Sequence, residues 1–252
     1  MTEAFEAGPG EISFRLEKVR ENIRAACLRA GRDPESVTLV AVSKTKPMAA
    51  IREAYGAGVR HFGENYVQEL MGKLRDPELP AGEDPIRWHM IGHLQKNKVK
   101  YLAGQVSMIH SVDSVDLAAQ IEKDAARREW TAEILLEVNT GGEETKFGFA
   151  PEEILEAARK ISVFPHLLLR GLMTSAPYTE NGETNRPYFR TLRCLAEQLA
   201  REGLIAPGRD GKASPELSMG MSCDYETAVE EGATLVRVGT DIFGARDYGL
   251  KA

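Results

Sequence analysis

The sequence predicts an α/β fold, a single (β/α)8 barrel of the TIM type. Short apolar runs rich in β-branched residues alternate with longer amphipathic stretches, which is the pattern of repeated βα units around a parallel sheet. The chain has 252 residues, close to the roughly 250 that are typical of one eight-stranded barrel. No linker-like or low-complexity segment divides it, so residues 1–252 are expected to form one domain.

Eight apolar runs account for the strands. In order they are TLVAVS at 38–43, RHFG at 60–63, RWHMIG at 87–92, VSMIHS at 106–111, EILLEVN at 133–139, LLLRGLM at 167–173, ELSM at 216–219 and LVRVG at 235–239. Helical periodicity follows each of the first seven, and the last leads into a short glycine-containing tail. An additional helix over residues 12–30 stops before Gly31, a residue type that commonly ends helices. Residues 76–85 and 177–187 are expected to be loops within the same domain.

Composition excludes several classes of function. The formal net charge is −6, and acids and bases are mixed along the chain without a basic block, so no nucleic-acid partner is expected. Cys27, Cys194 and Cys223 are far apart, which argues against a zinc site or a disulfide framework and favours reduced thiols. Residues 1–10 lack an apolar core and are expected to be flexible, and no segment reaches the ~20 apolar residues that span a bilayer. A soluble cytoplasmic protein without a membrane partner is expected.

If the sheet closes, the carboxyl ends of all strands meet at one rim, where barrel proteins place their chemistry. Polar residues at those ends are therefore the first candidates for a site. They are Lys44, Glu64, Asn65, His89, His93, Asp113, Asn139, Thr174, Ser218, Ser222, Arg237 and Thr240, with Met173 and Gly239 beside them. Any barrel carries some polar groups there, so their chemical types are more informative than their number.

Lys44 ends the first strand within the segment SKTKP, residues 43–47. A lysine at the end of a buried strand can be partly desolvated, which lowers its pKa and frees an amine to condense with an aldehyde. Pyridoxal phosphate is the obvious aldehyde. The alternative is that Lys44 simply ends the strand with a solvated charge.

Two later segments have the features of an anion site. Residues 218–222 (SMGMS) lead into a helix, so Ser222 and nearby backbone N–H groups can face a phosphate, although plain helix capping explains Ser222 equally well. After the last strand, Gly239 permits close backbone approach and Thr240 adds a hydroxyl donor. Barrels commonly bind phosphate in the loops after strands seven and eight, so the two segments support each other.

Arg237 lies inside the last predicted strand. Pointing into the barrel it needs an acceptor, and a pyridine nitrogen is a suitable one. Because arginine does not readily give up a proton, it would leave that nitrogen unprotonated and make the ring a poor electron sink. The alternative is an arginine that faces outward toward the helices.

Together these residues resemble the pyridoxal phosphate homeostasis proteins, small barrels related to the N-terminal domain of alanine racemase. The resemblance covers nearly the whole chain. Its matching blocks are LVAVSKTKP at 39–47, FGENYVQE at 62–69, WHMIGHLQKNK at 88–98, RGLM at 170–173, LSMGMS at 217–222 and VRVGTDIFGAR at 236–246.

The resemblance implies that Lys44, rather than Lys46, carries pyridoxal phosphate as an internal aldimine. It also implies phosphate contacts from the seventh and eighth strand loops and an arginine near the pyridine nitrogen. The predicted cofactor-binding residues are Lys44, Asn65, His89, Ser218, Ser222, Arg237, Gly239 and Thr240, with no metal ligand and no catalytic residue. His93 departs from the proline or serine common in relatives, which concerns only the shape of the third loop.

Alanine racemase adds a C-terminal β-domain that brings a tyrosine to the second face of the cofactor, and this chain ends at Ala252, soon after its last strand. Racemisation by two bases needs a proton donor on each face, and nothing in the sequence places Tyr66 or Tyr248 there. We therefore expect a monomeric, non-catalytic protein for homeostasis of this vitamin B6 cofactor, with supply to apo-enzymes as an implied role. The alternative is a weak amino acid racemase or lyase that uses Lys44 as a base.

Overall fold

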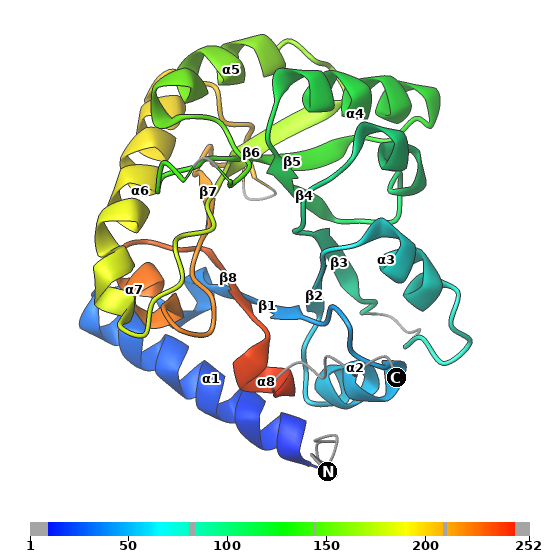
Figure 1. The fold of residues 1–252 in the computed structure, drawn as a ribbon, viewed down its shortest axis with the longest axis vertical. Helices are drawn as coiled ribbons and strands as arrows, with labels where there is room; N and C mark the ends of the chain where they lie inside the picture. The colour runs from blue at the N-terminus through cyan, green and yellow to red at the C-terminus, as the bar shows by residue number, and fades with distance from the viewer. Residues whose placement is uncertain (1–9, 81–83, 144, 209–210, 245–252) are drawn as a thin grey trace.

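Eight parallel strands close into a barrel in the computed structural model, with β8 pairing back to β1 (Figure 1). The structure describes residues 10–80, 84–143, 145–208 and 211–244. The strands are β1 (Thr38–Val42), β2 (His61–Glu64), β3 (Arg87–Met90), β4 (Met108–Val112), β5 (Ala132–Glu137), β6 (Leu167–Met173), β7 (Glu216–Ser218) and β8 (Leu235–Val238). All eight predicted strands are confirmed, each beginning and ending within two residues of its prediction.

Helices form a ring around the barrel (Figure 1). The α-helices are α1 (Glu11–Arg29), α2 (Met48–Gly56), α3 (Val67–Leu74), α4 (Val115–Arg127), α5 (Ile154–Ile161), α6 (Arg186–Arg201), α7 (Tyr225–Glu230) and α8 (Thr240–Phe243). Short 3-10 helices are η1 (Pro34–Ser36), η2 (Lys96–Tyr101), η3 (Pro151–Glu153) and η4 (Gly182–Asn185). Among the described residues, none of these helices has the length and apolar content needed to cross a membrane.

Two connections differ from the prediction. After β3 the chain forms only the 3-10 helix η2, in which Val99 is the one buried residue, so these six residues lack the repeated apolar positions of an α-helical face. After β8 the expected tail instead begins with the short helix α8, because Ile242 and Phe243 are both buried against the core. Some predictions fall on positions outside the described residues. These positions are most of the predicted flexible segment 1–10, residues 81–83 of the first predicted loop, and Tyr248.

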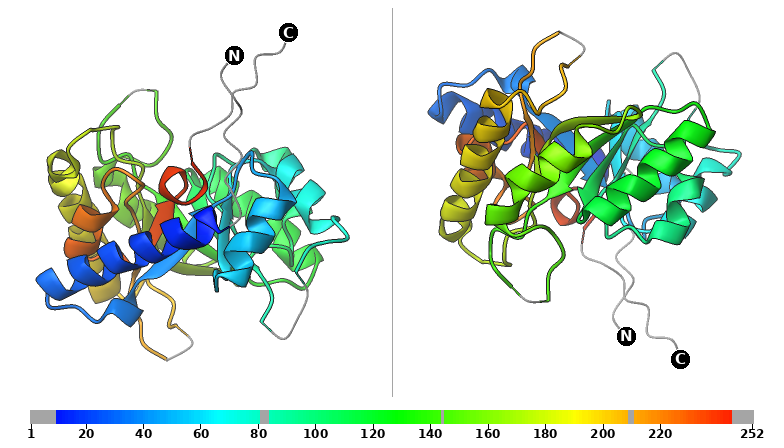
Figure 2. Two further views of the ribbon diagram at one scale, coloured as in Figure 1. Left: turned by 90° about the horizontal axis from the view of Figure 1, so that it is seen from below. Right: turned by 90° about the horizontal axis from the view of Figure 1, so that it is seen from above.

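The predicted N-terminal helix is confirmed as α1. Its buried residues recur every three or four positions, at Ile12, Leu16, Val19, Ile23 and Ala26, which gives it one apolar face. That face packs against α2, α7 and α8, so α1 lies across the outside of the barrel next to β8 and β1 (Figures 1 and 2). The segments that start and end the barrel are thereby held together.

The barrel interior is only partly apolar. A small cluster of Val40, Met108, Leu135, Met173 and Leu235 fills one part of it, separate from the larger core between strands and helices. Barrel interiors are usually dominated by bulky branched residues. Here buried polar side chains, described below, occupy the remaining interior positions.

Gly171 allows β6 and β7 to pair closely. A Cβ atom at this position would lie 1.9 Å from the backbone oxygen of Glu216, so no larger residue fits without moving a strand. The neighbouring β5–β6 register also shifts between Ile134 and Leu135. Gly171 therefore sets the distance between β6 and β7, the two strands from which two of the rim loops begin.

Candidate functional site

The carboxyl-terminal rim of the barrel holds a cavity of about 680 Å³. Loops that follow β1, β2, β3, β6, β7 and β8 line it. Pockets for small ligands typically measure about 300–1,000 Å³, so a cofactor-sized molecule fits. Its lining residues are Val42, Lys44, Lys46, Asn65, Ile91, Ser175, Tyr178, Met221, Ser222, Cys223, Arg237, Gly239, Thr240, Asp241 and Gly244.

Lys44 enters the cavity from a turn whose backbone is fixed on both sides. The next residue, Thr45, has a φ of 63°, a left-handed conformation that is uncommon for a β-branched side chain. Its backbone N–H donates to Glu69 Oε1 at 2.5 Å, which stabilises the turn. On the other side, Lys73 Nζ donates to the backbone oxygen of Ser43 at 2.7 Å. The start of the Lys44 side chain is therefore held in place by contacts from α3.

A buried ionic network lies directly beneath this turn. Lys73 Nζ lies 2.7 Å from both Glu64 Oε1 and Glu69 Oε1, and Ser43 Oγ donates to Glu64 Oε1 at 2.6 Å. Burial raises the pKa of Glu64, although Lys73 and the Ser43 hydroxyl oppose the shift. The cost of removing these ions from water offsets much of their attraction, so the network adds little net stability, but losing one partner would leave a buried charge uncompensated. The network therefore fixes the geometry of the turn. The sequence did not identify Lys73, because its spacing from Glu69 is typical of an exposed helical ion pair.

The second lysine of the segment has a different role. Lys46 Nζ donates to the backbone oxygens of Phe243 at 3.0 Å and Gly244 at 3.4 Å. These are carbonyls at the end of α8, where a cation is favourable. Lys46 thus connects the β1 loop to the β8 loop across the cavity rim.

Arg237 points into the barrel, so the outward alternative is wrong. Its Nη1 donates to Ser218 Oγ at 2.6 Å, and its Nη2 donates to the backbone oxygen of Thr174 at 2.8 Å. Burial lowers the pKa of Arg237 to about 10, against the opposing charges of Glu137 and Asp224. The guanidinium therefore remains charged at neutral pH. These two bonds use two of its five N–H groups, and the same side chain lines the cavity.

Ser222 is not the cap of the following helix. The residue before α7 is Asp224, whose Oδ1 accepts from the backbone N–H of Met221 at 2.6 Å. Ser222 Oγ instead accepts from the backbone N–H of Asp241 at 3.4 Å, which joins the β7 and β8 loops. At Gly239 an added Cβ would lie 3.3 Å from Val42 Cβ, so glycine keeps β8 close to β1 at the cavity floor.

Asn65 reaches the cavity because the β2 and β3 loops approach closely. A Cβ at Gly92 would lie 2.5 Å from the backbone oxygen of Asn65 and 2.7 Å from its Cα. Beside this contact, His93 stacks on Phe147 with ring centroids 3.6 Å apart and bonds Asp113 Oδ2 at 2.9 Å. The third loop thus has a defined shape built on His93.

Of the eight predicted site residues, six line the cavity and two lie beneath it. Lys44, Asn65, Ser222, Arg237, Gly239 and Thr240 are lining residues. Ser218 is fully buried and contacts Arg237. His89 is buried in the barrel interior, between His61 and His110. These two residues are placed to act on the cavity through other side chains.

Glu137 is an ionisable residue near the rim that the sequence did not single out. It ends β5, two positions beyond the interior residue Leu135, so both side chains point into the barrel. Burial, and the nearby charge of Asp113, raise the pKa of Glu137 to about 7, while Arg237 opposes the shift. A glutamate at a strand end gives no sequence signal of such burial, because its environment depends on the strands across the barrel.

The raised pKa of Glu137 has a consequence for stability. Folding favours the protonated carboxyl, so its contribution is complete below the ordinary pKa of 4.5 and is lost as pH rises through about 7. Between pH 4.5 and 8 we expect the wild type to lose about 3 kcal/mol of unfolding free energy that Glu137→Gln does not lose. Urea unfolding of both proteins at several pH values measures this difference. Parallel pH profiles would contradict it.

Residues 14–247 match the family defined by the alanine racemase N-terminal domain. The chain is 48% identical over 237 residues to the pyridoxal phosphate homeostasis protein of Aquifex aeolicus, covering 93% of this chain and 98% of that protein. It is 40% identical over 241 residues to the protein of the same name from Escherichia coli K12, covering 96% and 99%. The chain belongs to the pyridoxal phosphate homeostasis protein family.

Solved structures agree with this family membership. An unknown protein from Bifidobacterium adolescentis superposes with a TM-score of 0.82 at 40% identity, covering 92% of this chain and 94% of that one. PipY of Synechococcus elongatus PCC7942, a structure with pyridoxal phosphate bound, gives 0.76 at 36% identity, covering 92% and 100%. An alanine racemase of Clostridium difficile gives 0.68 at 14% identity and shares the fold alone, with 56% of its length covered. The predicted barrel type of this family member is thus confirmed.

Proposed function

We propose that this protein binds pyridoxal phosphate in the rim cavity, holds it covalently through the Lys44 amine, and serves cofactor homeostasis rather than turnover of a substrate. The observation that carries the proposal is that one cavity joins a lysine, a buried arginine and a hydroxyl-rich turn. The names of the relatives and the cofactor in PipY support it.

The residues of the cavity fit the three functional parts of this cofactor. The Lys44 amine would hold the aldehyde carbon, and the β7 and β8 loops, with Ser222, Gly239 and Thr240, would hold the phosphate. Arg237 would face the pyridine nitrogen with N–H groups that do not bond to Ser218 or Thr174. His89 would act from beneath rather than by direct contact.

Arg237 supports storage over catalysis. When bound, pyridoxal phosphate supplies an aldehyde that captures amines and a ring that withdraws electrons from them. Withdrawal is strongest when the ring nitrogen is protonated, which a carboxylate partner favours. The pKa of Arg237, at about 10, keeps the guanidinium a donor at neutral pH, so the nitrogen it faces would remain an acceptor.

One observation favours a weak racemase or lyase as the second candidate. Tyr178 lines the same cavity as Lys44, and its side chain is 82% exposed, so a phenol is available near the rim. Two-base chemistry needs such a group opposite the lysine. Deuterium incorporation at Cα of free amino acids distinguishes the candidates. Exchange that the wild type catalyses and that both Lys44→Ala and Tyr178→Phe lose would establish catalysis. A wild type without exchange supports storage.

We further propose a monomer of the cytoplasm that transfers its cofactor to apo-enzymes. The cysteines Cys27, Cys194 and Cys223 are unpaired thiols, as expected in a reducing compartment. The lysine, arginine and hydroxyl groups assigned to the cofactor all come from one chain, which favours a monomer.

Removing the two hydroxyls of the proposed phosphate site tests that assignment. In the double variant Ser222→Ala/Thr240→Ala we expect the dissociation constant for pyridoxal phosphate to rise about 100-fold, because each hydrogen bond to a charged group contributes about 1.5 kcal/mol. Equilibrium dialysis measures it, with the exposed pair Ser36→Ala/Thr131→Ala as the matched control. Equal affinity in the double variant and the control would reject the phosphate assignment.

A further inference from the structure

A continuous chain of hydrogen bonds crosses the barrel interior and ends at Arg237. His61 Nδ1 lies 2.8 Å from His89 Nε2, and His89 Nδ1 lies 2.8 Å from His110 Nε2. His110 Nδ1 lies 2.8 Å from Ser218 Oγ, the atom to which Arg237 donates. The proposed function uses the arginine but gives no role to His61 and His110, and it leaves open how His89 acts from beneath the cavity.

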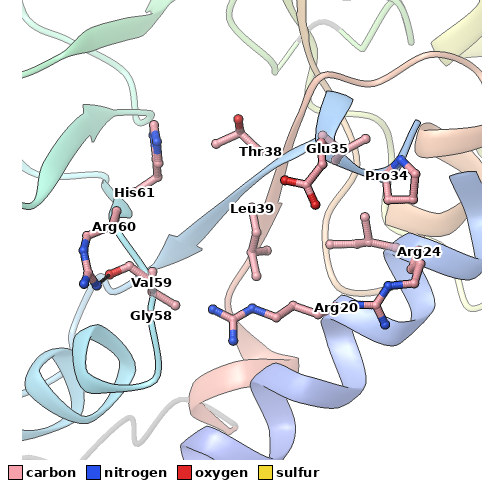
Figure 3. Close-up of a pocket in the computed structure, with 12 residues that line it drawn as sticks. Arg20, Arg24, Pro34, Glu35, Thr38, Leu39, Gly58, Val59, Arg60 and His61 are labelled. Carbon is pink, nitrogen blue, oxygen red and sulfur yellow. Dashed lines mark hydrogen bonds between the residues drawn. The ribbon is translucent and has the colours of Figure 1, made fainter. Parts of the chain in front are cut away.

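The other end of this chain reaches the amino-terminal end of the barrel. A cavity of about 390 Å³ opens there, and Figure 3 shows His61 at its edge, with Arg20 and Arg24 extending from α1 on the opposite side. Arg87 Nη1 donates to His61 Nε2 at 3.3 Å. Arg87 is partly exposed and also pairs with Asp84 at 3.2 Å, so it is the surface end of the chain.

Arg87 determines the direction of every hydrogen bond in the chain. A guanidinium can only donate, so His61 Nε2 must be an acceptor and the hydrogen of a neutral His61 must be on Nδ1. His89 Nε2 then accepts, which places the His89 hydrogen on Nδ1 as well. The same step applies to His110, which donates from Nδ1 to Ser218. All three imidazoles are therefore in the Nδ1–H form.

The three histidines of this hydrogen-bond chain are neutral. Burial lowers the pKa of His61 to about 4 and that of His89 to about 3, and it also lowers the pKa of His110 well below 6.5. All three are neutral at physiological pH, so each ring has one donor and one acceptor nitrogen. Successive rings bond each other directly through their nitrogens, and no group of metal-holding side chains is found in the described part of the chain.

Two donors converge on Ser218. Its Oγ accepts from His110 Nδ1 and from Arg237 Nη1, which uses both lone pairs. The hydroxyl hydrogen of Ser218 therefore cannot turn toward His110, and the three imidazole N–H dipoles all point toward the guanidinium. If the hydrogen bonds between the histidines ran in the opposite direction, the Ser218 hydroxyl would donate to His110, and the imidazole N–H dipoles would point away from the guanidinium.

We propose that Arg87 is a positioning residue for Arg237: from the opposite end of the barrel it fixes the direction of the histidine chain and thereby orders Ser218, the acceptor that holds the guanidinium. The consequence for the cofactor rests on the proposed function, because it passes through Arg237. The direction of the hydrogen bonds between the histidines does not depend on any cofactor.

Two variants of one residue isolate this effect. Arg87→Met keeps the aliphatic stem and removes every donor, whereas Arg87→Lys keeps a group that can only donate. Arg87 is partly exposed, so neither change leaves a cavity in the core. Long-range ¹H–¹⁵N spectra of the protein without cofactor report which ring nitrogen of each histidine carries hydrogen, and the Arg237 Nε–H resonance reports the guanidinium environment.

We expect Nδ1–H forms for His61, His89 and His110 in the wild type and in Arg87→Lys. In Arg87→Met we expect a second population with hydrogen on Nε2 and a shifted Arg237 resonance. Wild-type histidines with hydrogen on Nε2, or an Arg87→Met spectrum identical to the wild type, would overturn the proposal.

The cofactor then gives an independent readout. In Arg87→Met the release rate of pyridoxal phosphate should change by roughly 2- to 30-fold, the range for a change of 0.5–2 kcal/mol in coupling, while Arg87→Lys should behave as the wild type. A changed tautomer with an unchanged release rate would show that the chain does not act on Arg237 and would also overturn the proposal. If the wild type binds no pyridoxal phosphate, the proposed function fails, and the cofactor-free spectra alone decide the direction of the chain and its effect on Arg237.

Discussion

Replacing Lys44 with alanine is expected to abolish covalent capture of pyridoxal phosphate completely. The turn would keep the hydrogen bonds that Lys73 and Glu69 make to its backbone. Without the amine, however, no bond to the aldehyde can form at this position. Incubation with the cofactor, removal of excess and an absorbance spectrum measure the result. The wild type should retain a band near the visible edge and Lys44→Ala should show none.

Lys46→Ala is the matched control for this experiment. Lys46 lines the same cavity two residues away, yet its amine donates to the carbonyls at the end of α8. Its removal should loosen the β8 loop and leave covalent capture intact. A retained band in Lys44→Ala, or a band lost only in Lys46→Ala, would reject the assignment of Lys44.

Acidification is expected to destabilise the protein steeply, because neutral histidines in the barrel interior must become charged. The pKa of His61 in the folded state, about 4, lies below the ordinary 6.5, so its contribution to stability is complete above pH 6.5 and is lost as pH falls through about 4. The pKa of His89, about 3, extends the loss to lower pH. His61 and His89 each account for about 3 kcal/mol by pH 4, a large share of a typical total of about 5–15 kcal/mol.

Urea unfolding between pH 7 and pH 4 measures this effect. The comparison protein is His61→Asn, which keeps an N–H donor near the position of Nδ1 but does not titrate. The quantity compared is the change with pH, so that any constant cost of the substitution cancels. We expect the wild type to lose about 3 kcal/mol more than the variant over this range. Equal losses would show that His61 is charged or exposed in the folded protein.

The fold was predictable because the same sequence pattern, an apolar run followed by an amphipathic stretch, recurs along the chain. Eight apolar runs at the spacing of βα units indicate a barrel even when single boundaries are wrong by two residues. The two connections that differed, η2 and α8, are short. Their conformation depends on whether residues such as Val99 and Phe243 find a place in the core, which local sequence does not determine.

The candidate site was predictable where its residues are adjacent to strand ends. Lys44, Asn65, Ser222 and Gly239 meet at the rim because parallel strands end together, and this follows from topology alone. The orientation of Arg237 could not be decided from its own segment. It depends on Ser218 and Thr174, which approach it from two other strands.

The interior network was beyond sequence reasoning for a physical reason. His110 and Ser218 are 108 residues apart and meet only across the closed barrel. Whether His110 points inward also depends on a register shift in β4 between Ile109 and Val112, and an irregular strand does not keep a strict alternation of faces. Lys73 is similar, since only the packed structure distinguishes this buried lysine from an exposed one.

The most direct test of the central claim is borohydride reduction of the protein after incubation with pyridoxal phosphate, followed by mass mapping of the modified peptide. Reduction converts a bond between the cofactor aldehyde and a lysine amine into a stable one, so the mass increase marks the lysine that carried it. We predict one modified residue, Lys44. An unmodified protein, or a label on other lysines with Lys44 free of it, would contradict the proposed function.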